Sequence, residues 1–223
     1  MGWIVITVIL YLLATKVYRR FPRPFTLPVL TVTAALICLL IMFGLSHDDY
    51  IANGGKWISE LLGPAIVSLA VPLFKQRRVL MRNSVPIVIG AASGIVILMV
   101  VNISLGQIFG MNEELILTSI PQLTTMPIAV SLAEQIGGIP SLTAVFVMIA
   151  GILGGALGPV ILKLFRLKSM VGKGVGLGCA SHIIGVTQMM KESEEGATIA
   201  SVTMIVTGLL ASILVPLIVY LFL

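Results

Sequence analysis

The sequence predicts an all-α integral membrane protein of about seven to eight membrane segments, at roughly 20 residues per crossing. Of its 223 residues, 58% are hydrophobic and only 10% are charged, whereas a soluble domain carries about 25% charged residues to solvate its surface. Prolines, glycines and hydroxyl-bearing residues interrupt several apolar stretches, which indicates discontinuous or re-entrant helices. We therefore expect a single polytopic membrane domain over residues 1–223, in which N-terminal scaffold helices (1–56) precede a core with broken helices (57–223).

The apolar stretches define the expected segments. Four of them are long and uninterrupted, and they cover residues 28–45, 85–109, 139–165 and 197–222. The other candidates are short or carry polar residues, and they cover 2–15, 57–74, 115–135 and 174–190. Residues 2–15 precede the nearest basic residues, which reverses the order found in a signal peptide, so we expect them to remain as a first helix.

Three basic clusters predict how the chain crosses the membrane. They cover residues 16–23, 75–82 and 163–173. Cytoplasmic loops are enriched in Lys and Arg, so we place all three clusters in the cytoplasm and the N-terminus outside. Three candidate segments separate the last two clusters, where an even number is needed. We therefore expect 115–135 to be a re-entrant hairpin, broken by Pro121 and Pro127, although one exception to the charge rule would remove the need for it.

Two short stretches of the chain resemble each other. Residues 64–70 read PAIVSLA and residues 127–133 read PIAVSLA, and an uninterrupted apolar segment follows each. The pair favours an internal, inverted repeat, although apolar sequences also match by chance. Carriers built from repeats place paired broken helices at the substrate site, so the pattern favours an elevator-like carrier architecture.

The first polar break contains Gly63 and Pro64. Proline removes an amide donor and glycine permits close approach, so we expect a helix break at these two residues. Glu60 lies one turn earlier and is either part of this break or solvated at the membrane interface.

The second break lies between Pro121 and Pro127, which enclose Gln122, Thr124 and Thr125. These side chains form a dense set of hydrogen-bond donors in an otherwise apolar region. A half-helix that begins near Pro127 would direct its free amides and positive dipole end toward this loop, which suits a carboxylate. The alternative is a proline-kinked helix whose threonines bond back to its own carbonyls.

The third break extends from Gly178 to Gly185 and contains Ser181 and His182. An ionisable residue at membrane depth is a functional candidate by default, and imidazole exchanges a proton near neutral pH. We expect Ser181 and His182 to contact substrate, with His182 or Glu134 as the proton carrier. A histidine with only a structural hydrogen-bonding role is the alternative.

The same residues exclude several classes of function. The sequence contains no nucleophile elbow, phosphate-cradling loop or metal-ligand spacing, so we expect no enzyme, no cofactor and no metal site. The basic clusters indicate topology and contact with a lipid bilayer rather than nucleic-acid binding. The polar breaks favour a secondary transporter of a small organic anion that works by alternating access. We also expect the protein to form a homo-oligomer such as a dimer.

Several ordered motifs give the chain a resemblance to a known family. They are residues 61–65 with 70–73, Thr125 with 127–129, residues 137–145, Ser181 and His182 with Gly185, and residues 195–197. From about Trp57 to the C-terminus, the sequence resembles the LrgB/CidB family of bacterial membrane proteins, to which half of the plastid glycolate/glycerate transporter also belongs. The resemblance implies a multi-pass protein of the bacterial cytoplasmic membrane that works beside a small LrgA/CidA-type partner.

The resemblance implies two functions. Members are described as holin-like or antiholin-like regulators of murein hydrolase activity and cell lysis, or as carriers of monocarboxylates such as pyruvate, glycolate, glycerate or lactate. A purely structural membrane subunit is a third possibility. The family pattern usually has a Lys where this chain has Gln122, and smaller or hydroxyl residues where it has Ile183 and Val186. These departures indicate a retained site with altered affinity, substrate or transport competence.

Overall fold

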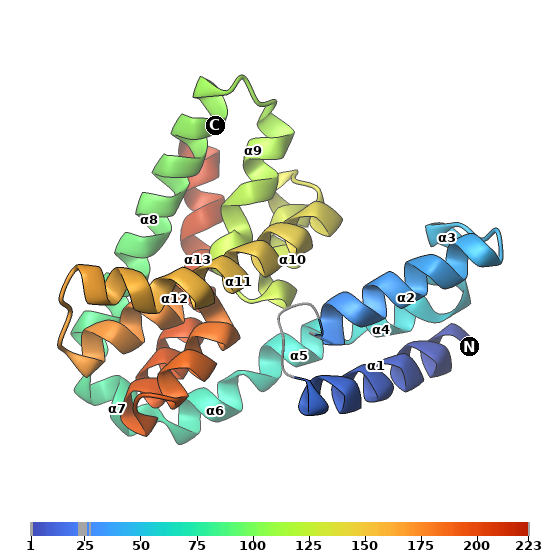
Figure 1. Ribbon diagram of the computed structural model, residues 1–223. Coiled ribbons are helices and arrows are strands. Elements are labelled where there is room, and N and C mark those ends of the chain that lie inside the picture. The colour runs from blue at the N-terminus through green and yellow to red at the C-terminus, as the bar shows by residue number, and fades with distance from the viewer. Residues whose placement is uncertain (1, 22–25, 27, 223) are drawn as a thin grey trace. The chain divides into compact units, whose positions relative to one another are not determined.

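The computed structural model describes residues 2–21, 26 and 28–222, and every regular element within them is helical. The chain divides into two units, Met1–Ala65 and Ile66–Leu223, which are described separately. In chain order (Figure 1), the elements are α1 (Gly2–Arg20), α2 (Pro28–Met42), α3 (His47–Tyr50), the π-helical turn η2 (Ile51–Gly55), α4 (Lys56–Glu60), α5 (Leu62–Ser68), α6 (Ala70–Lys75), α7 (Arg77–Arg82), α8 (Ser84–Ile108), α9 (Glu113–Ser119), the 3-10 helix η3 (Ile120–Leu123), α10 (Met126–Ile136), α11 (Pro140–Leu164), α12 (Met170–Met190) and α13 (Glu194–Phe222).

The first unit is held together by contacts between α1 and the segment that follows α2. The rings of Trp3 and Tyr50 meet edge to face, with centroids 5.8 Å apart. The hydroxyls of Thr7 and Tyr50 lie 3.2 Å apart and share a hydrogen bond. These contacts join α1 to the beginning of the broken helix over His47–Lys75, which contains Gly63 and Pro64.

Among the described residues, five helices are long and apolar enough to cross a bilayer. They are Gly2–Arg20, His47–Lys75, Ser84–Ile108, Pro140–Leu164 and Glu194–Leu221, and Leu30–Met42 is a shorter apolar helix. Counting the short helix and the two helical hairpins described below with the five gives eight segments, and counting any two of these three gives seven, which is the expected range. A multi-pass membrane protein is the architecture that these helices fit.

The second unit is built around α13. Half of the most apolar window of α13 is buried, against 22% for α8 and 17% for α11. On α8, the buried residues Ile87, Ala91, Ile95 and Met99 recur every four positions, which makes one narrow stripe that faces the core. The remaining faces of α8 and α11 are apolar and exposed, as expected of helices that contact lipid.

Helices α9 and α10 and the 3-10 helix between them form a hairpin over residues 113–136, the first hairpin. Near its open end, the hydroxyl of Thr118 accepts a hydrogen bond from the amide of Ile139 (2.9 Å). The hydroxyl of Thr143 donates to the Thr118 carbonyl (2.7 Å). Gly138 passes so close that an added Cβ would lie 2.9 Å from the Cα of Thr118. The chain therefore returns beside α9 before α11 begins, which agrees with the hairpin expected over 115–135.

Helix α12 also folds back on itself, and we call residues 170–190 the second hairpin. The ammonium of Lys173 pairs with the carboxylate of Glu192, although a straight helix would separate these residues by about 28 Å. A Cβ on Gly185 would lie 2.8 Å from the carbonyl carbon of Leu177, so the two halves are in contact. The reversal occurs at His182, the residue with non-helical torsions inside α12.

The sequence predicted a break from Gly178 to Gly185 within one candidate membrane segment over 174–190, and the structure shows that the chain reverses at this break. Its halves, 170–181 and 183–190, are about 18 Å and about 12 Å long at 1.5 Å per residue. Each is shorter than the hydrocarbon core, which is about 30 Å thick. The apolar pattern of the segment indicated a membrane segment, but it did not reveal the reversal of the chain.

Candidate functional site

The tips of the two hairpins meet inside the second unit. At the tip of the second hairpin, His182 is 6% exposed, and its imidazole interacts with the backbone of Leu123 in the first hairpin. The ring also lies beside α11, because a Cβ on Gly151 would be 3.8 Å from its Nδ1. Two breaks that lie far apart in the sequence are therefore neighbours in the fold.

The tip of the first hairpin is shaped by its two prolines. Pro121 is buried in the first turn of η3, and Pro127 lies in the first turn of α10, positions where a missing amide hydrogen is tolerated. The carbonyl of Pro121 accepts hydrogen bonds from the amide and from the hydroxyl of Thr124, both at 3.0 Å. Thr125 is extended and begins α10 without a side-chain cap.

Three buried polar atoms at the two tips have no hydrogen-bond partner: Thr125 Oγ1, Ser181 Oγ and His182 Nε2. Ser181 is fully buried. The great majority of buried side-chain polar atoms are paired with protein or water, and an unpaired one costs several kcal/mol in an apolar environment. The three atoms lie on two adjoining tips, and the Ser181 hydroxyl faces α11, where a Cβ on Gly154 would overlap it.

The structure separates the two threonines of the first tip. Thr124 bonds back to Pro121, which is the behaviour expected of a kinked helix, so its hydroxyl supports the turn. Thr125 makes no such bond, and its hydroxyl remains available. The back-bonding threonine offered as the alternative by the sequence is therefore observed for Thr124 and not for Thr125.

Gln122 is half-buried and its side-chain amide donates to Oδ1 of Asn102, at 3.4 Å. The Asn102 amide in turn donates to the carbonyl of Ser119, at 3.3 Å. Sequence reasoning missed Asn102, although an asparagine within the apolar stretch 85–109 was a signal that could have revealed it. Asn102 therefore connects α8 to the first tip and holds Gln122 in place.

The electrostatic character of the tips comes from helix ends. Helix α10 begins at Met126 and the second half of α12 begins after His182, so each tip contains the N-terminal, positive end of a half-helix. Glu134 is exposed near the far end of α10, about 13 Å along the helix from Thr125 at 1.5 Å per residue. The structure thus brings His182, but not Glu134, to the place where the tips meet.

The remaining predicted positions have structural surroundings of their own. Gly63 and Pro64 lie in the first unit, where the helix is interrupted at Leu61. A Cβ on Gly178 would lie 2.8 Å from the Cα of Ala200, so this glycine allows α12 to contact α13. Gly185 has the same role between the halves of the second hairpin.

Comparison with known proteins identifies relatives over nearly the full length. The LrgB-like family model matches residues 7–221, so the similarity begins well before Trp57. A protein of Bacillus subtilis named YxaC and described as uncharacterized is 42% identical over 98% of this chain and 95% of its own. The holin-like protein CidB of Staphylococcus aureus is 31% identical over 98% of this chain and 95% of its own. No solved structure matches the chain.

Proposed function

This chain belongs to the LrgB-like family, and we propose that it is a secondary carrier of a small organic anion, a monocarboxylate such as pyruvate, glycolate, glycerate or lactate. One observation carries the proposal. Two helical hairpins place their tips together in the interior of a membrane-embedded unit, and the tips carry unpaired buried polar atoms from Thr125, Ser181 and His182. Helices that only pack against lipid or against one another need no such tips.

The chemistry of the tips favours an anion of low charge. Hydroxyls and an imidazole donate hydrogen bonds, and the positive ends of two half-helices add partial charge. Where the family pattern has Lys, this chain has Gln122, which supplies dipoles without a fixed charge. A single carboxylate suits this set better than a multivalent anion, whose desolvation would require full positive charges.

The arrangement of elements supports alternating access. A long helix precedes each hairpin: α8 precedes the first and α11 precedes the second. With the basic clusters in the cytoplasm, the first hairpin enters from outside and the second from inside. Entry from opposite sides would relate these two pairs by inversion, as in repeat-built carriers with a central site. This relation differs from the match between residues 64–70 and 127–133, and it is the basis for proposing an elevator-like movement.

We further propose that His182 couples transport to protons. Histidine is the side chain that gains and loses a proton near neutral pH, and His182 is the ionisable residue at the tips. Its interaction with the backbone of Leu123 links its protonation state to the contact between the hairpins. Glu134 is the second candidate, at the exposed end of the first hairpin.

The test is uptake of labelled pyruvate, glycolate, glycerate and lactate into proteoliposomes. We expect saturable uptake of at least one of them, a reduction of roughly tenfold or more in Thr125→Ala and Ser181→Ala, and a lower KM in Gln122→Lys, which adds a positive charge at the tip. Ser131→Ala, on the exposed middle of α10, is the matched control and should transport normally. Absence of flux and binding for the whole panel would refute the carrier.

Proton coupling has its own test. In His182→Gln, we expect accumulation driven by an inward proton gradient to be lost while exchange of labelled for unlabelled substrate continues. If gradient-driven accumulation persists in this variant and fails in Glu134→Gln, the proton carrier is Glu134.

The name of several relatives favours a second candidate, a holin-like or antiholin-like protein that regulates murein hydrolase activity and cell lysis. Such a protein predicts graded and unselective leakage of dyes from proteoliposomes that tolerates changes at Thr125 and Ser181. A carrier predicts saturable flux that these changes abolish. For either function we propose the bacterial cytoplasmic membrane as the location, a homodimer as the assembly and a small LrgA/CidA-type membrane protein as the partner.

A further inference from the structure

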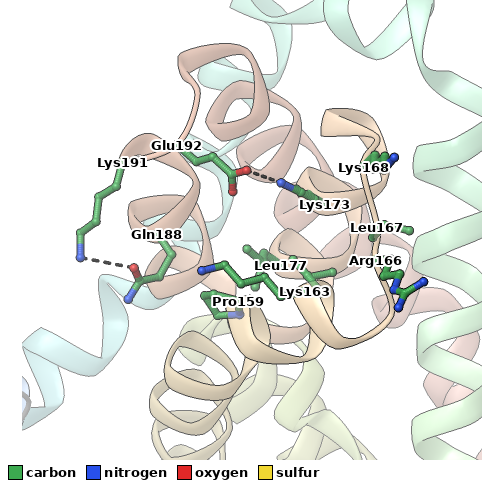
Figure 2. Close-up of a pocket in the computed structure, with 11 residues that line it drawn as sticks. Pro159, Lys163, Arg166, Leu167, Lys168, Lys173, Leu177, Gln188, Lys191 and Glu192 are labelled. Carbon is green, nitrogen blue, oxygen red and sulfur yellow. Dashed lines mark hydrogen bonds and ion pairs between the residues drawn. The ribbon is translucent and has the colours of Figure 1, made fainter.

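A basic pocket lies at the open end of the second hairpin, away from the hairpin tips (Figure 2). It has a volume of about 640 Å³, which is within the range of ligand-binding cavities. Its lining comes from the end of α11, the loop 165–169 and both halves of α12: Pro159, Leu162, Lys163, Arg166, Leu167, Lys168, Lys173, Leu177, Gln188, Lys191 and Glu192.

The charge of the lining is strongly one-sided. Five of the chain's 14 basic residues line the pocket, against a single carboxylate, that of Glu192. Lys173 pairs with Glu192, and Lys191 donates to the side chain of Gln188 at 3.3 Å. Among the described residues, Lys163, Arg166 and Lys168 have no carboxylate within ion-pair distance. The pocket lining therefore has a net positive charge, because Glu192 neutralises only one of its five basic side chains.

The backbone of Arg166 gives a second, independent observation. Arg166 adopts a left-handed conformation with φ of 51° where α11 ends, and its amide and that of Leu167 donate to the carbonyls of Lys163 and Leu162, both at 2.9 Å. Glycine is the usual residue at this position of a helix end, because other residues are strained there. An arginine in this strained conformation, with its side chain in the lining of the pocket, is consistent with a role for the guanidinium there.

We propose that this pocket binds a phosphate-bearing anion, either a phospholipid headgroup or a soluble phosphate compound. Arginine and lysine are the side chains that proteins use for phosphate, and basic pockets between membrane helices accept phosphorylated headgroups. The uncharged lining of Pro159, Leu162 and Leu177 suits the apolar part of a lipid. Bound across the pocket, the anion holds the two halves of the second hairpin to the end of α11.

The test is thermal unfolding followed with a thiol-reactive dye. Cys179 is buried in the second unit and Cys38 is exposed, so a Cys38→Ser background makes Cys179 the reporter. We expect sodium pyrophosphate, compared with chloride at equal ionic strength, to raise the Tm saturably, by roughly 5 °C at about a hundred times its Kd. A parallel arm replaces about one fifth of the phosphatidylcholine in nanodiscs with phosphatidylglycerol.

The variants distinguish a specific phosphate site from nonspecific electrostatic attraction of the anion to the basic protein. Arg166→Gln with Lys168→Gln should abolish the rise, whereas the matched pair Arg78→Gln with Arg82→Gln, exposed cations of the same unit outside the pocket, should retain it. Arg166→Gly should unfold at a higher temperature than the parent without anion, yet show a smaller rise with it. Glu192→Gln should bind pyrophosphate about fivefold more tightly, because Lys173 loses its competing carboxylate.

The unfolding measurements with pyrophosphate and with phosphatidylglycerol each either support or contradict a phosphate site in this pocket. A rise with pyrophosphate identifies a soluble phosphate ligand, and a rise only with phosphatidylglycerol identifies a headgroup; both support the pocket. No rise in either arm, or an equal rise in the Arg166→Gln/Lys168→Gln variant, overturns it. These outcomes do not depend on whether the protein carries a monocarboxylate.

Discussion

His182 adopts a backbone conformation that residues other than glycine rarely take. Its φ of 49° and ψ of −133° are close to the first central position of a type II′ turn, where glycine is strongly preferred. Such torsions cost about 1–3 kcal/mol for a residue with a side chain. The chain therefore keeps an imidazole at the hairpin tip where glycine would fit the backbone better, a combination of strain and burial that is typical of functional sites.

We predict that His182→Gly is more stable than His182→Ala by about 1–2 kcal/mol. Both changes remove the imidazole and its interaction with Leu123, so their difference isolates the backbone. Within a helix the order is reversed, because glycine is about 1 kcal/mol worse than alanine. Thr187 is an exposed residue in the second half of α12. As a control, Thr187→Ala should therefore be more stable than Thr187→Gly. Thermal unfolding measures both pairs, and a more stable His182→Ala would contradict the strained turn.

For single residues, the sequence predicted which polar side chains lie at the breaks but not their partners. It predicted polar side chains at both breaks, and the structure brings Gln122 and Thr125 to one tip and Ser181 and His182 to the other. It did not distinguish Thr124 from Thr125, because that difference depends on which hydroxyl faces the Pro121 carbonyl. It also missed Asn102, whose contact with Gln122 joins residues 20 positions apart.

Among the elements, the second hairpin depends on glycines that allow backbones to touch. Gly174 and Gly178 face α13, where a Cβ on Gly174 would lie 2.8 Å from the carbonyl oxygen of Gly196. Gly176 is exposed, and the nearest atom to its added Cβ is 3.9 Å away. The alternate glycines of this stretch therefore form two classes, close-packed and free, which sequence spacing alone does not separate.

Gly178→Ala and Gly176→Ala should accordingly shift stability in opposite directions. Gly178→Ala forces α12 away from Ala200 and should cost about 2 kcal/mol or more through overpacking. Gly176→Ala makes no close contact and should stabilise the helix by up to about 1 kcal/mol. Thermal unfolding reported by Cys179 measures both variants. Equal Tm values would show that α12 and α13 are not as closely packed as the structure has them.

For the chain as a whole, the sequence predicted the class of protein well but did not predict the reversal of α12. Composition alone predicted a helical membrane protein, because a chain with 10% charged residues cannot solvate a globular surface. The parity of the basic clusters predicted the first hairpin. The second hairpin was not predicted because the loop after α12, residues 191–195, has a single basic residue, Lys191, so the charge rule did not require it to lie on the side of the basic cluster 163–173.

The two hairpins predict a membrane topology that differs from the sequence-based one after residue 170. If α12 crossed the membrane, Lys191 would lie on the side opposite Lys168; because α12 folds back, both should lie on the cytoplasmic side. We predict that Lys168→Cys and Lys191→Cys, each in a Cys38→Ser background, react with a membrane-impermeant maleimide only in inside-out vesicles, and that Met111→Cys reacts only in right-side-out vesicles. Lys168 and Lys191 are exposed and Met111 lies in the loop before α9, so these changes should not disturb folding. Labelling at 168 and 191 from opposite sides would establish a crossing at α12, and the meeting of two oppositely entering tips, on which the carrier mechanism depends, would then be wrong.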